Sequence, residues 1–140
     1  MKTYKIIANS DAVGTHEGTL TKRLRSGELK AGAVICFDAD SDHIKACPLD
    51  GKPWGVLIKD AKKEEPVAVQ TLTACSQTAL LRVKGAVHAG DLICLADQGL
   101  VQALPSSAGT YTLIGLALTD GENEERFEAL TTLPHSIEVK

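Results

Sequence analysis

The residues best placed to do chemistry are three alternating aspartates in the segment Asp38-Ala39-Asp40-Ser41-Asp42. This spacing resembles the opening of a calcium-binding loop, in which alternating carboxylates converge on one cation. That loop also needs Gly at its sixth position and a bidentate Glu at its twelfth, where this chain has His43 and Leu49. The segment therefore predicts a solvated hairpin turn and no metal site.

Histidine and cysteine are the other residue types that bind metals or serve in catalysis, and their spacing favours neither role. The histidines are scattered, the cysteines form no CxxC pair, and no nucleotide-binding, serine-hydrolase or zinc-protease motif occurs. These residues are His16, His43, His88, His135, Cys36, Cys47, Cys75 and Cys94. We expect unpaired thiols, with Cys36 and Cys94 in the core, and no catalytic, metal-ligating or cofactor-binding residues. The chain is predicted not to be an enzyme.

Lys22, Arg23 and Arg25 form a basic cluster near the start of the chain. Residues 1–30 contain six Lys and Arg against three Asp and Glu, so this end carries +3 and the remainder −6 of the net −3. The cluster is too small for a nucleic-acid stripe, and 4% aromatic residues provide no stacking platform for bases. Guanidinium groups fit carboxylates, so we predict that these three residues bind an acidic or carbonyl-rich protein surface.

Length and composition are typical of one globular domain. The chain has 140 residues, of which 44% are hydrophobic and 24% charged. Its longest apolar runs are far shorter than the roughly 20 residues of a membrane helix, and its N-terminus lacks the apolar centre of a secretory signal. We therefore expect a protein made and kept in a cytoplasm, with neither membrane nor nucleic acid as a partner.

An internal repeat determines the expected fold. KAGAVICFDADSDHIKACP at 30–48 matches HAGDLICLADQGLVQALP at 88–105, and WGVLIKD at 54–60 matches IGLALTD at 114–120. Short runs rich in Val, Ile, Leu and Thr between Gly, Asp and Pro indicate strands, so each half reads as a β-meander. The repeat aligns Trp54 with Ile114, which favours a core or interface role for the tryptophan.

The predicted fold is all-β with a minor helix, a small β-barrel or β-sandwich whose two duplicated halves close around one core. The one helix candidate is Thr19–Leu29. Residues 1–28 are expected to be an N-terminal arm and residues 29–140 a single β domain, with the repeat at 30–69 and 88–129.

The strings LKAGAVICF, WGVLIKDA, VKGAVHAGDLICLADQGLV and LIGLALTDG, which cover most of residues 29–121, resemble the capsid cement, or head decoration, proteins of tailed bacteriophages and prophages. This resemblance implies a non-enzymatic β-rich protein that attaches to the major capsid protein shell and reinforces it, often as a trimer, with an N-terminal arm. The implied location is the capsid surface of a virion, after synthesis in the cytoplasm of a bacterial host.

Two other functions remain open. The string VKGAVHAGDLICLADQG is also similar to the strand-turn-strand of biotinyl and lipoyl carrier domains, although Lys84 lacks the flanking residues that frame their modified lysine. Another virion component, such as a tail or fibre-base module, would use the same β architecture for subunit contact.

Overall fold

A computed structural model describes residues 19–73 and 78–140, and every regular element in these residues is a β-strand. The strands of the first half are β1 (Thr19–Leu24), β2 (Glu28–Leu29), β3 (Val34–Asp38), β4 (Asp40–Ala46), β5 (Gly55–Leu57), β6 (Ala61–Lys62) and β7 (Val67–Thr71). Those of the second half are β8 (Ala79–Arg82), β9 (Ala86–Val87), β10 (Leu92–Leu95), β11 (Val101–Ala103), β12 (Gly109–Ala117), β13 (Gly121–Glu122) and β14 (Arg126–Val139). The all-β prediction is confirmed.

The first half closes into a barrel with strand order β1-β4-β3-β5-β7. Its neighbours are antiparallel except β1 and β4, which run parallel where Leu24 lies opposite Ile44. Inward-facing aliphatic side chains such as Ile35, Leu57 and Val69 fill this barrel. Closure pairs every strand of the sheet with two neighbours, so the small barrel has no free sheet edge.

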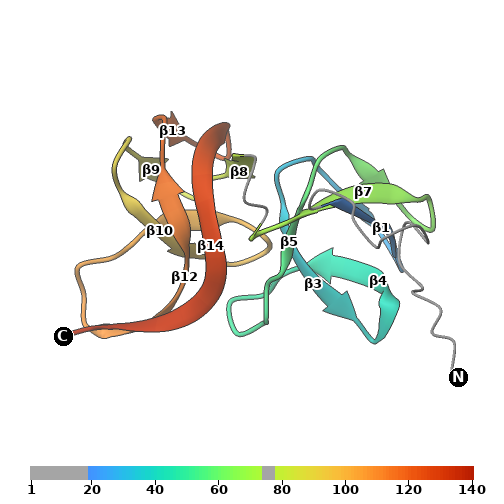
Figure 1. Cartoon of the computed structure of the whole chain (residues 1–140), viewed down its shortest axis with the longest axis horizontal. Coiled ribbons are helices and arrows are strands. Elements are labelled where there is room, and N and C mark those ends of the chain that lie inside the picture. Colours follow the sequence, from blue (N-terminus) through green and yellow to red (C-terminus); the bar gives the residue numbers. More distant parts are fainter. Residues whose placement is uncertain (1–18, 74–77) are drawn as a thin grey trace, which may run out of the picture.

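The second half repeats this arrangement with strand order β11-β10-β12-β14-β8. A parallel bridge between Val83 and Val101 joins its two ends, which makes a nearly closed second barrel. The two barrels lie side by side along the long axis of the molecule, and the long β14 curves over the second one (Figure 1). The prediction of a barrel made from two duplicated halves is confirmed.

Hydrogen bonds at repeated positions show how closely the halves correspond. Gly32 donates its N–H to the Leu57 carbonyl at 2.8 Å, and Gly90 donates to Ala117 at the same distance. Both glycines have positive φ, 93° and 95°. Asp60 accepts the N–H of Ala31 and Asp120 that of Ala89, each at 2.8 Å. Gly55 and Gly115 likewise occupy the same place in β5 and β12.

The structure differs from the sequence predictions in two respects. Thr19–Leu29 forms β1 and β2 and no helix, because Thr19, Leu20, Thr21 and Lys22 pair with β7. Residues 19–28 therefore belong to the first barrel, whereas residues 1–18 of the expected arm lie outside the described residues. The halves also do not close around one common core: one buried cluster fills the first barrel, and a second cluster combines the interior of the second barrel with the face of the first barrel that packs against it.

The barrels are joined by the β10–β11 turn of the second, which inserts into the end of the β3–β4 hairpin of the first. The N–H of Val34 donates to the Gly99 carbonyl at 2.8 Å, and the N–H of Gly99 donates to the Cys47 carbonyl at 2.9 Å. A Cβ at Gly99 would lie 2.8 Å from the Val34 carbonyl oxygen. The side chain of Arg82 also donates to the Ala31 carbonyl at 2.7 Å.

We predict that Gly99→Ala destabilises the protein more than Gly85→Ala. Both glycines have similar positive φ, 77° and 80°, so each substitution should cost about 1 to 2 kcal/mol of left-handed strain. Only Gly99 faces a close backbone atom, whereas a Cβ at Gly85 meets nothing within 4 Å, so Gly99→Ala should cost roughly 2 kcal/mol more through overpacking. Chemical denaturation measures both losses, and equal losses would contradict the inserted turn.

Candidate functional site

The basic cluster predicted from sequence lies on and just after β1, beside β4. Lys22 donates through Nζ to the Ser41 carbonyl at 2.7 Å, and Arg25 Nη2 lies 2.6 Å from Asp40 Oδ2. Arg23 is exposed, and its side chain makes no hydrogen bond or ion pair to any residue between 19 and 73 or 78 and 140. The structure thus brings the three cations near the acidic hairpin and leaves Arg23 available to a partner.

Asp40 is the centre of an ion-pair network in that hairpin. Its Oδ1 accepts the backbone N–H groups of Asp42 and His43 at 2.9 Å each, which fixes the turn. His43 donates through Nδ1 to Asp40 at 2.9 Å and through Nε2 to Glu64 at 2.8 Å. An imidazole has two N–H donors only when protonated, so this geometry fits the charged form of His43.

The pKa values in this network follow from its hydrogen bonds. The hydrogen bond to Asp40 raises the pKa of His43, with a smaller contribution from Glu64. The side chain and backbone of His43 and the Asp42 amide hold the pKa of Asp40 well below its usual range. A raised histidine pKa stabilises the fold at pH values below the ordinary pKa of the group, and this contribution is lost as pH rises through the raised value.

Asp40 is the aspartate of the DADSD segment whose carboxylate takes part in this network. Asp40 uses its carboxylate for Arg25, His43 and two backbone amides. Among the described residues, no group of three His, Cys, Asp or Glu side chains could hold a metal. Cys36, Cys47 and Cys94 are buried and free, as predicted for Cys36 and Cys94, while Cys75 and His16 lie outside the described residues. Burial raises the pKa of Cys47 to about 12, which leaves this thiol unreactive.

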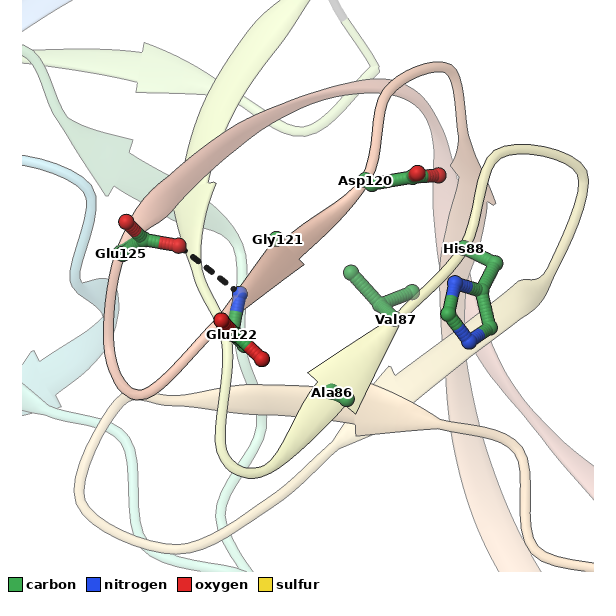
Figure 2. Close-up of a pocket in the computed structure, with 7 residues that line it drawn as sticks. All are labelled: Ala86, Val87, His88, Asp120, Gly121, Glu122 and Glu125. Atoms are coloured by element: carbon green, nitrogen blue, oxygen red, sulfur yellow. Dashed lines mark hydrogen bonds between the residues drawn. The ribbon is translucent and has the colours of Figure 1, made fainter.

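A shallow pocket of about 300 Å³ lies in the second barrel, beside β9 and β13 (Figure 2). Its acidic residues are Asp120, Glu122 and Glu125. Two of these carboxylates already bind backbone: Asp120 accepts from Ala89, and Glu125 accepts from the Glu122 N–H at 3.2 Å. These contacts order the turns around the pocket.

Sequence reasoning missed a stacked aromatic pair on the first barrel, in which Phe37 is exposed and Trp54 is partly buried. The rings of Phe37 and Trp54 stack with centroids 4.9 Å apart, and Lys22 Nζ lies 5.9 Å from the Phe37 ring. Phe37 is 49% exposed, and the buried Trp54 Nε1 has no hydrogen-bond partner among the described residues. Trp54 packs against the core of the first barrel, as the alignment with Ile114 suggested. The same alignment would have revealed Phe37, which occupies the place of the buried Leu95.

The chain was compared with family models, curated proteins and solved structures. No protein-family model matches the chain, and no curated protein is similar to it in sequence. Among solved structures, the chain is similar to the N base of the head fibre gp8.5 of bacteriophage phi29. The TM-score is 0.64, and the match covers 83% of this chain and 94% of the other at 16% identity. The two proteins share a fold. Since the described residues contain no helix, none of them forms a helix that could cross a membrane.

We predict that Asp40→Asn lowers the pKa of His43. The substitution removes the carboxylate whose hydrogen bond is the main cause of the raised value. Titration of the His43 ring protons by NMR measures the change. Asp42→Asn is the matched control, because it removes a neighbouring charge but leaves the Asp40–His43 contact in place. A similar decrease in both variants would mean that general charge, and not this contact, sets the pKa.

Proposed function

We propose that this chain is a non-enzymatic structural protein of a phage or prophage virion, which attaches as a symmetric homo-oligomer, most simply a trimer, to the outside of the capsid. The observation that carries the proposal is the shared fold with the phi29 head-fibre base over 83% of the chain.

The resemblance of the sequence strings to head decoration proteins favours reinforcement of the shell. The similarity to gp8.5 equally favours a second function, the base of a fibre that projects from the head. Electron microscopy of virions with labelled protein distinguishes the two, since a cement protein should cover symmetric positions over the shell and a fibre base should carry a projecting shaft. A carrier domain would instead gain mass on incubation with a biotin or lipoyl ligase.

The basic cluster is the proposed capsid-binding site, and Arg23 is the member of it that we propose contacts the capsid. Lys22 and Arg25 are already bonded to Ser41 and Asp40, whereas the Arg23 side chain is exposed. A guanidinium group fits a carboxylate or carbonyl pair on a capsid subunit. The net negative charge of the rest of the chain lies mostly in the second barrel. It therefore does not oppose the binding of an acidic capsid surface at the basic cluster of the first barrel.

We predict that Arg23→Glu weakens attachment to expanded heads of the encoding phage at least tenfold and makes the residual binding less sensitive to salt. Co-sedimentation at two salt concentrations measures both effects, with the oligomeric state of the variant checked beforehand. Lys59→Glu, an equal charge change at an exposed position of the same barrel, is the control and should bind as the parent does. Equal losses in both variants would show a general charge effect, and no binding by the parent would refute the proposal for that capsid.

Removal of residues 1–18 should weaken attachment and leave thermal unfolding nearly unchanged. The first barrel closes with β1, which begins at Thr19, so both barrels keep all their strands without the preceding residues. Calorimetry and co-sedimentation of the truncated chain measure the two properties. A lowered melting temperature with intact binding would instead assign these residues to the fold.

A further inference from the structure

The repeat allows each surface position of one barrel to be compared with its counterpart in the other. On the outer face of the first barrel, Val34, Val56 and Gln70 form a cross-strand row over β3, β5 and β7. All three are buried, with exposures of 0%, 2% and 6%. Gln70 donates through Nε2 to the Thr78 carbonyl at 3.2 Å, and Val34 and Val56 belong to the hydrophobic cluster of the second barrel. This row is the contact face for the second barrel.

The corresponding row on the second barrel consists of Leu92, Leu116 and Leu130, paired across β10, β12 and β14. Leu92 and Leu130 are 45% and 49% exposed, and Leu116 is partly exposed. A row of three leucines on the solvent side of a barrel is unusual where the alternate residues already fill the core. The side chains are more apolar than those of the buried row, yet no described segment covers them.

The backbone around this leucine row repeats the socket that receives Gly99. Leu104 donates its N–H to the Leu92 carbonyl at 2.8 Å, as Cys47 donates to Val34 at 2.9 Å. In the first barrel, the Val34 N–H and the Cys47 carbonyl then bind the inserted turn. In the second barrel, no described segment binds the Leu92 N–H and the Leu104 carbonyl in this way.

No segment within residues 19–73 or 78–140 inserts against the end of the first barrel that corresponds to the inserted end of the second. Leu81, Leu95 and Ile114 lie at that end of the second barrel, in the cluster shared with Val34 and Val56. Their counterparts in the first barrel are Lys22, Phe37 and Trp54, which form the stacked aromatic pair and the lysine above it. Arg82, which binds the Ala31 carbonyl, corresponds to the exposed Arg23, and Gly99 corresponds to Asp42.

Charge also favours a contact between unlike barrels. Residues 19–73 contain nine Lys and Arg against eight Asp and Glu. Residues 78–140 contain four Lys and Arg against eight Asp and Glu. Two second barrels would repel each other, while a first barrel carries no such excess of negative charge. A heterologous contact between unlike surfaces repeats from copy to copy and closes as a ring when its rotation allows.

We propose that the leucine row Leu92–Leu116–Leu130 is the docking surface for the first barrel of a second copy of this chain, so that copies assemble head to tail. The Phe37–Trp54 end of one copy then covers the leucine row of the next. This inference rests on the proposed function, because it names the surface through which the proposed homo-oligomer forms. Its test uses no capsids, so the oligomer contact and the capsid attachment can fail independently.

The test is the mass in solution of three forms of the full chain, measured by sedimentation over a range of concentrations. The parent should form species of several copies, three if the ring is the trimer. Leu92→Glu with Leu130→Glu should reduce the mass to one copy, 14.8 kDa, with unchanged thermal unfolding. The matched control is Leu49→Glu with Leu133→Glu, at leucines 59% and 68% exposed, and it should assemble as the parent does.

Cross-linking supplies a second measurement that does not depend on the stability of the double variant. A chain carrying Leu92→Cys is mixed with a chain carrying Asp42→Cys, both with Cys75→Ser, and treated with a short bismaleimide. The mixture should give a covalent dimer, whereas Lys59→Cys in place of Asp42→Cys should not. A parent that stays monomeric at all concentrations, a charged leucine row that leaves the mass unchanged, or equal cross-linking to Lys59→Cys would each overturn the proposal.

Discussion

The insertion of the Gly99 turn between Val34 and Cys47 is the constraint on which the two-barrel arrangement depends. The strands of each barrel pair within their own sheet, but the Val34 N–H and the Cys47 carbonyl of the first barrel bind Gly99 of the second. The inserted peptide supplies hydrogen bonds that only a residue without a side chain can make at this distance. Once the turn is seated, Val34 and Val56 are withdrawn from water, and the two barrels become one continuous apolar cluster on that side.

The fold class could be predicted from sequence because the repeat preserves the residues that dictate local geometry. Gly32 and Gly90 turn the chain at positive φ, and Asp60 and Asp120 bind the same amide in each half. The closure of each half on itself could not be predicted, because it depends on the parallel contact of Leu24 with Ile44, between strands well separated in the chain. The same contact explains why Thr19–Leu29, whose composition suits a short helix, is drawn into strands.

The residues of the candidate site could be predicted from the sequence, but the contacts of their side chains could not. The sequence places Lys22, Arg23 and Arg25 together, but it does not reveal that the acidic hairpin binds two of them. The residues of this network, such as Asp40 and Glu64, are far apart in the chain and come together only when the barrel closes. Within that hairpin, the Asp40 carboxylate binds Arg25, His43 and two backbone amides. One residue of the acidic segment thus pairs with one residue of the basic cluster, while the Arg23 side chain stays exposed.

Because the chain contains two similar barrels, the exposure of a surface position in one barrel can be compared with that of its counterpart in the other. Positions with the same backbone role should show similar exposure, unless a neighbour covers one of them. Val34 and Val56 are covered and Leu92 is not, although leucine loses more on exposure to water than valine does. The three leucines occupy the same places on their strands as Val34, Val56 and Gln70, which the neighbouring barrel covers. An uncovered apolar row at these places is what a contact that continues from one copy to the next requires.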